Sequence, residues 1–124
     1  MCTMTREKPV LQIAEEDIEV YKLCIKEGGD IVSSYHFGKK YVKNELYYTD
    51  LSPFVSERGF YKSGAGFYSY QDPKYGNCKF IIPKGATYYL CKDRFNDSYI
   101  YHSDQIKFIG IYDEELSAYG NLLI

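Results

Sequence analysis

Residues 78–91 carry the clearest structural pattern of the chain and read Cys78-Lys79-Phe80-Ile81-Ile82-Pro83-Lys84-Gly85-Ala86-Thr87-Tyr88-Tyr89-Leu90-Cys91. Residues 78–82 and 86–91 are rich in β-branched and aromatic side chains, which favour strands. Pro83 lacks the backbone N–H that strand pairing requires, so residues 83–85 are expected to form a turn or a bulge. This stretch therefore predicts two strands that meet at a proline.

Strand patterns continue on both sides of this stretch. Strict alternation of apolar and polar residues over 18–23 predicts a half-buried strand, although a helix over 13–25 competes with it. Further segments with strand character are 31–37, 41–48, 66–70 and 105–112. Turn-forming residues separate these short segments, which is typical of antiparallel architecture. We therefore expect an α+β, strand-dominated fold with mostly antiparallel sheets and one or two short helices.

The expected helices are short, and one domain is expected. Ser52 as N-cap and Pro53 at the first helical position favour a helical turn within 51–59. A second short helix and a tail are expected over 113–124. Residues 1–12 carry weak order signals and are interpreted as a flexible N-terminal tail, which leaves 13–124 as a single compact domain. The length of 124 residues is close to the commonest domain size of about 100–150 residues.

The net charge and the lack of targeting segments indicate which partners and which cellular compartment to expect. The formal net charge is −2, with 15 Lys and Arg against 17 Asp and Glu. This balance gives no general attraction to phosphate backbones, so no double-stranded nucleic acid partner is expected. Residues 1–6 lack the apolar region of a secretory signal, and no apolar run is long enough to span a membrane. A cytoplasmic protein without a membrane partner is therefore expected.

Cysteine and histidine are too sparse and too scattered to predict reactive chemistry. The four cysteines form no C-x-x-C pair, and Cys24, Cys78 and Cys91 are expected to be buried free thiols. Only His36 and His102 are available as imidazole ligands, so no metal site is expected. No catalytic residue and no cofactor is predicted, and whether the chain is an enzyme stays open, with a leaning towards no.

Tyrosine is the unusual feature of the composition. The chain has 15 Tyr and 7 Phe but no Trp. A flat ring packs well on a pleated, half-buried surface, so one interpretation is simple strand packing. An apolar ring with a polar tip also serves recognition surfaces well, so the second interpretation is an aromatic binding surface.

Four blocks resemble, in order, small uncharacterised proteins of gut bacteria and their phages. The blocks are Glu16-Asp17-Ile18-Glu19-Val20-Tyr21-Lys22, Gly66-Phe67-Tyr68-Ser69-Tyr70, Ile81-Ile82-Pro83-Lys84-Gly85-Ala86-Thr87-Tyr88-Tyr89, and Tyr101-His102-Ser103-Asp104-Gln105-Ile106. The likeness covers residues 13–112. It implies a phage or mobile-element accessory protein, and it implies no particular chemistry.

The same blocks look, more distantly, like ADP-ribosyltransferases. Lys22 stands where that family usually has the arginine of its first strand, and Ser69 keeps only the first serine of the Ser-Thr-Ser motif. Gln105 stands in the place of the catalytic glutamate, whose charge stabilises the cationic sugar as nicotinamide leaves. A neutral amide cannot supply that charge. The resemblance therefore implies a degenerate domain that binds NAD or a related nucleotide with weak or no transferase activity.

Together these observations predict a non-catalytic binding module for a small ligand or a protein partner. The alternatives are the degenerate transferase-like domain and a structural or assembly subunit. Strand order and oligomeric state cannot be read from the pattern. The candidate ligand-binding residues are Tyr21, Lys22, His36, Lys39, Lys40, Ser69, Tyr70, His102 and Gln105.

Overall fold

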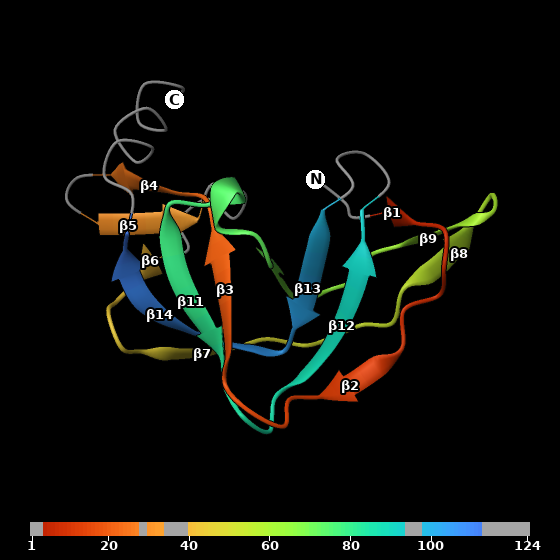
Figure 1. Cartoon of the computed structure of the whole chain (residues 1–124), viewed down its shortest axis with the longest axis horizontal. Coiled ribbons are helices and arrows are strands. Elements are labelled where there is room, and N and C mark those ends of the chain that lie inside the picture. The colour runs from red at the N-terminus through yellow and green to blue at the C-terminus, as the bar shows by residue number, and fades with distance from the viewer. Residues whose placement is uncertain (1–3, 28–29, 34–39, 94–97, 113–124) are drawn as a thin grey trace.

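The computed structural model describes residues 4–27, 30–33, 40–93 and 98–112, which form three antiparallel sheets (Figure 1). The central sheet has the order β2-β12-β13-β10-β3-β11-β14-β7. Its strands, in that order, are Leu11–Ile13, Thr87–Lys92, Tyr99–Ser103, Phe67–Tyr70, Ile18–Lys22, Cys78–Ile82, Gln105–Ile111 and Leu46–Tyr48. The strand-dominated, antiparallel character expected from the sequence is confirmed, and residues 18–22 form a strand and not a helix.

Two small sheets accompany the central one. One has the order β1-β9-β8, with strands Met4–Thr5, Phe60–Lys62 and Val55–Glu57. The other has the order β4-β5-β6, with strands Cys24–Glu27, Asp30–Ser33 and Lys40–Tyr41. In Figure 1, β3, β11 and β14 stand apart from β12 and β13, so the central sheet is strongly bent.

The proline segment 83–85 is a corner of the bent sheet and not a hairpin turn. β11 pairs with β3 and β14, whereas β12 pairs with β2 and β13, so these two consecutive strands do not pair with each other. At the corner, the Gly85 N–H donates to the Ala14 carbonyl oxygen at 2.9 Å, and the Ala14 N–H donates to the Ala86 carbonyl oxygen at 2.8 Å. The chain thereby passes from one half of the sheet to the other.

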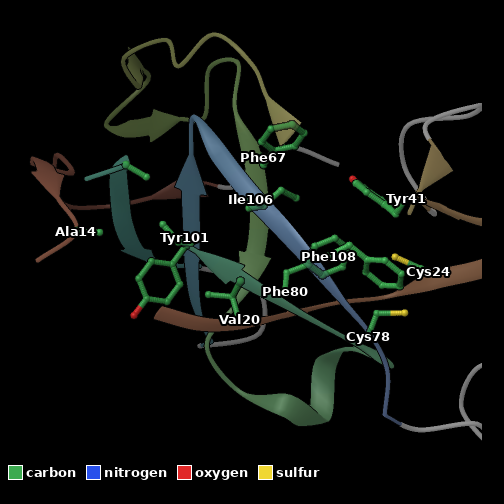
Figure 2. Close-up of a cluster of buried hydrophobic side chains, with 12 residues drawn as sticks. Ala14, Val20, Cys24, Tyr41, Phe67, Cys78, Phe80, Tyr101, Ile106 and Phe108 are labelled. Atoms are coloured by element: carbon green, nitrogen blue, oxygen red, sulfur yellow. The ribbon is translucent and has the colours of Figure 1, made fainter. Parts of the chain in front are cut away.

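The bent sheet carries a hydrophobic core on each face. The first core, shown in Figure 2, gathers Val20, Phe80, Ile106 and Phe108 with other buried side chains. The second core consists of Phe54, Tyr70, Tyr89, Cys91 and Ile100. Successive side chains of β13 point to opposite faces of the sheet. Tyr101 therefore packs in the first core and Ile100 in the second.

Many tyrosines pack inside these cores. The Tyr41 ring lies edge-on to the Phe80 ring at a centroid distance of 4.9 Å. Tyr70, Tyr89 and Tyr101 are also buried. These contacts support strand packing as one cause of the tyrosine surplus.

The helical expectations are corrected. Residues 51–59 contain no helix, because Val55–Glu57 is strand β8, and the Ser52 N–H donates to the Ala65 carbonyl oxygen at 2.9 Å. Pairing with β9 therefore overrides the local capping signal. Within the described residues, the only helical element is the three-residue 3₁₀ helix Pro73–Tyr75. The expected helix over 113–124 lies outside the described residues.

Part of the segment 1–12, which was expected to be a flexible tail, forms paired strands. β1 pairs with β9 through Met4 and Lys62, and β2 pairs with β12 through Leu11 and Tyr89. These strands are too short to show a periodic pattern, and their partners are distant in sequence. Residues 1–3 lie outside the described residues. Within the described part, no helix has the length and apolar character needed to cross a membrane.

Candidate functional site

Several predicted site residues lie on the adjacent strands β3, β10 and β13. Tyr21 and Tyr70 are Cα partners between β3 and β10, and both take part in aromatic packing. The Tyr21 ring lies edge-on to the Tyr112 ring at 5.3 Å, and the Tyr70 ring lies 5.1 Å from the Tyr75 ring. These two predicted ligand-binding tyrosines therefore also serve as packing residues.

Two further predicted residues that the structure describes, Lys40 and Gln105, lie on other strands. Lys40 is exposed at the start of β6 in a different sheet. His36 and Lys39 lie outside the described residues. Gln105 is half-buried at the start of β14, where it is the Cα partner of Tyr48.

Lys22 and Gln105 lie on opposite faces of the central sheet. Ile81 is the Cα partner of both Glu19 and Lys107, so Glu19 and Lys107 share a face. Gln105 precedes Lys107 by two residues and shares that face, whereas Lys22 follows Glu19 by three residues and takes the other. The single nucleotide cleft implied by the transferase resemblance needs both on one face, and this geometry gives it no support.

Lys22 is a fully buried cation. Its Nζ donates to the Tyr68 carbonyl oxygen at 2.7 Å and lies 3.9 Å from the centroid of the Tyr68 ring. Burial lowers the pKa of Lys22 to about 8, and the nearby Cys24 raises it slightly in return. Because its side chain is 0 % exposed, Lys22 cannot meet a ligand without a rearrangement of the fold.

His102 completes this buried polar cluster, which we define as Lys22, Tyr68 and His102. Burial, together with the charge of Lys22, lowers the pKa of His102 to about 4, so its imidazole is neutral near pH 7. Its ring packs edge-on against Phe54 at 5.2 Å. Ser69, another predicted site residue, is also fully buried, and its hydroxyl has no hydrogen-bond partner within the described residues.

A groove of about 780 Å³ lies away from this cluster, between the N-terminal segment and the end of β12. We call it the N-terminal groove. Its lining residues are Thr5, Arg6, Glu7, Lys8, Pro9, Val10, Gln12, Leu90, Cys91, Lys92, Asp93 and Tyr99. Its volume falls in the range of about 300–1,000 Å³ that is typical of small-molecule sites.

Asp93 is the chemically distinctive group of the N-terminal groove. It is 1 % exposed, and its Oδ1 accepts a long hydrogen bond of 3.5 Å from the Met4 N–H. Its Oδ2 has no hydrogen-bond partner among the described residues. Buried carboxylates normally satisfy their oxygens, because an unmade hydrogen bond leaves the full desolvation cost uncompensated.

The rest of the groove carries three cationic side chains, the exposed acidic side chain of Glu7, and polar and apolar side chains. Arg6 and Lys8 are exposed on the N-terminal side. Lys92 lies on β12, with its Nζ 6.0 Å from the centroid of the Tyr99 ring. The groove therefore presents a buried anion together with cations and an aromatic wall.

The Cys91 thiol beside Asp93 is poorly suited to nucleophilic attack. Burial, assisted by the charge of Asp93, raises the pKa of Cys91 to about 12. The thiol donates to the Ile100 carbonyl oxygen at 3.6 Å. Since the thiolate is the nucleophilic form, this thiol is inert near pH 7.

None of the seven predicted site residues that the structure describes lines the N-terminal groove. Most of its lining comes from the segment interpreted as a tail. The alternation of Leu11, Gln12 and Ile13 was the available signal for order there, but three residues are too few to carry it. Within the described residues, no group of three or more His, Cys, Asp or Glu side chains could hold a metal ion.

No family model matches the chain, and no curated protein or solved structure shows a significant match to it. Function is therefore inferred from the N-terminal groove and the buried polar cluster.

Proposed function

We propose that the chain is a non-catalytic binding module that holds a small ligand in the N-terminal groove. The observation that carries this proposal is the buried Asp93 carboxylate, which lines the groove and has one oxygen without a hydrogen-bond partner among the residues that the structure describes. A ligand that donates a hydrogen bond to this carboxylate offsets the cost of its burial. A charged donor is favoured, because hydrogen bonds to ionised groups are the stronger ones.

The other residues that line the groove indicate which groups the ligand carries besides the hydrogen-bond donor. Arg6, Lys8 and Lys92 provide positive charge that attracts a carboxylate or a phosphate. Tyr99 and Val10 provide an aromatic and an aliphatic wall. A zwitterion with an ammonium group and an acidic group, such as a free amino acid or a short peptide, matches this arrangement.

The placement of the reactive groups supports binding without catalysis. Lys22 and His102 belong to the buried polar cluster and do not line the groove. Cys91 does line it, but its raised pKa of about 12 keeps the thiol protonated near pH 7. General acid–base chemistry needs a group whose pKa lies near the working pH and which reaches the substrate.

A thermal-shift screen with free amino acids, dipeptides, NAD, ADP-ribose and cyclic dinucleotides tests the proposal. A ligand that binds only the native state at a hundredfold excess over its Kd stabilises it by about 2.7 kcal/mol, which corresponds to several degrees in Tm for a domain of this size. We expect a shift with zwitterionic probes. If none of them shifts Tm, the proposed ligand class is wrong.

Two matched variants locate the binding site. Asp93→Asn keeps the side-chain shape but removes the charge, and we expect it to weaken binding by about tenfold or more, since a hydrogen bond to a charged group contributes about 1.5–3 kcal/mol. Asp50→Asn removes a charge from an exposed position outside the groove and should bind normally. Equal binding by both variants would place the ligand elsewhere.

A further inference from the structure

The N-terminal groove follows the edge of β12 beyond the point where β2 leaves it. The ladder between the two strands ends with the pair of Tyr89 and Leu11, whereas β12 continues to Lys92. Leu90, Cys91 and Lys92 all line the groove. In Figure 1 the chain between β1 and β2 curves away from β12 and returns to its end at β1. The groove therefore lies where a continuation of β2 would run.

The backbone of Leu90 faces the groove side of β12. The Ala86 carbonyl oxygen accepts from the Ala14 N–H on the β2 side, whereas the Asp93 N–H donates to the Ser98 carbonyl oxygen on the β13 side. In an antiparallel ladder, alternate residues direct their N–H and C=O groups to the same neighbour. Leu90 follows Ala86 by four residues and so directs its carbonyl oxygen to the β2 side, beyond the last ladder pair. This oxygen is a backbone acceptor for a ligand N–H.

Contacts mark both ends of the groove and limit the length of a ligand. The pair of Tyr89 and Leu11 marks one end, and the contact of the Met4 N–H with Asp93 Oδ1 at 3.5 Å marks the other. The three strand residues between Tyr89 and Asp93 span about 10 Å, at a rise of about 3.4 Å per residue. A free amino acid is shorter than this, whereas an extended peptide of two or three residues matches it.

We propose that the ligand of the N-terminal groove is an extended peptide of two or three residues with free termini, bound as an added strand on the edge of β12. This inference rests on the proposed function, because it assigns a ligand class to the same groove. The peptide ammonium donates to Asp93 Oδ2, the chain runs antiparallel to β12 towards Tyr89, and a peptide N–H donates to the Leu90 carbonyl oxygen. Main-chain hydrogen bonds supply the affinity in strand addition of this kind.

The charges of the groove fix the direction of the peptide. Asp93 is 1 % exposed, and its Oδ2 has no hydrogen-bond partner among the described residues, which favours the ammonium at that end. Of the exposed cations Arg6 and Lys8, Lys8 is nearer in sequence to Leu11 and therefore pairs with the peptide carboxylate at the other end. Glu7 is exposed in the same lining and opposes acidic side chains on the peptide, so a neutral peptide is favoured.

Isothermal titration calorimetry of the full chain with alanine, dialanine, trialanine and hexaalanine tests the length of the ligand. We expect dialanine or trialanine to bind at least about tenfold more tightly than the other two, because alanine cannot reach both Asp93 and Leu90 and hexaalanine exceeds the groove. Alanine that binds as tightly as trialanine, with both weakened by Asp93→Asn, overturns the peptide and leaves the proposed function intact. Equal binding of hexaalanine overturns the length limit, and binding of no probe overturns both proposals.

Altered peptides test strand addition without a change to the protein. N-acetyl-trialanine lacks the ammonium and should bind at least about tenfold more weakly than trialanine. Of two trialanine analogues with one amide each replaced by an ester, one should bind severalfold more weakly, because alternate N–H groups face β12. Full affinity of the acetylated peptide, or of both esters, overturns the strand addition.

A lysine variant tests the carboxylate end. Trialanine should bind the wild type more tightly than trialanine amide does, and Lys8→Gln should remove this difference. Lys84→Gln, at an exposed position outside the groove, should preserve it. A difference that persists in Lys8→Gln overturns the proposed direction of the peptide.

Discussion

The Nζ of Lys22 donates a hydrogen bond to the Tyr68 carbonyl oxygen at 2.7 Å inside the protein, with the lysine side chain fully buried. Lys22 follows Ile18 and Val20 at every second position of β3, so its side chain lies on the same face as the first core. Tyr68, in contrast, packs against the second core. The lysine therefore connects the two cores where the central sheet bends. A buried cation with one hydrogen bond and one aromatic ring is only partly compensated for the loss of water.

Lys22→Met is expected to change the pH dependence of stability. Burial lowers the pKa of Lys22 from its ordinary value of 10.5 to about 8 in the folded protein. Between these values the unfolded chain binds a proton that the folded chain does not, so the free energy of unfolding of the wild type rises with pH there. Relative to Lys22→Met, the wild type should gain about 2 kcal/mol between pH 7 and pH 10. Urea unfolding at both pH values measures this, and a constant difference would contradict the lowered pKa.

His102 should make the protein sensitive to acid. Burial and the charge of Lys22 lower its pKa from 6.5 to about 4. Between these values only the unfolded chain is protonated, so stability is full above pH 6.5 and is lost as the pH falls towards 4. We expect the wild type to lose about 2 kcal/mol more than His102→Phe between pH 7 and pH 4.5. The phenylalanine preserves a ring against Phe54, and parallel acid profiles of the two proteins would show that His102 is not the titrating group.

Asn77 should be essential for the attachment of the sheet β4-β5-β6. Its Oδ1 accepts from the Cys24 N–H at 2.8 Å, and its Nδ2 donates to the Cys24 carbonyl oxygen at 2.7 Å. The Asn77 side chain therefore forms the two backbone hydrogen bonds with the first residue of β4 that a neighbouring strand would otherwise form. Asn77→Ala leaves both backbone groups buried without these partners and should cost about 2–5 kcal/mol of unfolding free energy.

A surface variant provides the control for this loss. Lys74→Ala changes a side chain that is 66 % exposed and should stay within about 0.5 kcal/mol of the wild type. Denaturant unfolding of both variants gives the comparison. If Asn77→Ala is as stable as Lys74→Ala, the two hydrogen bonds do not hold β4.

Local pattern predicted the strands with the longest alternating or β-branched runs, such as residues 18–22 and 78–82. Pairing could not be predicted in the same way, because it depends on contacts between distant segments. The separation of β11 from β12 at Pro83 shows this, since the two strands are consecutive but lie in different halves of the sheet. The two- and three-residue strands β1 and β2 were missed because they are shorter than any recognisable period.

The candidate site was predicted poorly for a related reason. Lys22 was interpreted as a binding residue because it stands where the transferase resemblance expects an arginine. Its alternation with Glu19 and Tyr21, however, places it on the same apolar face as Ile18 and Val20. Asp93 gave no signal, because an aspartate before a polar turn is ordinarily a turn residue. Its burial depends on Met4 and Ser98, which contact it only in the folded chain.

Three cysteines should resist alkylation in the native protein. Cys24, Cys78 and Cys91 are buried free thiols, as expected from their apolar neighbours, and the pKa of Cys91 is raised to about 12. Alkylation requires an accessible thiolate. Burial removes the access to all three thiols, and the raised pKa of Cys91 also keeps that thiol protonated at pH 8. Iodoacetamide at pH 8 followed by peptide mass spectrometry should find these three sites unmodified in the native protein and modified in urea. Modification of Cys91 in the native protein would show that the end of β12 opens. The floor of the N-terminal groove would then be accessible to the reagent.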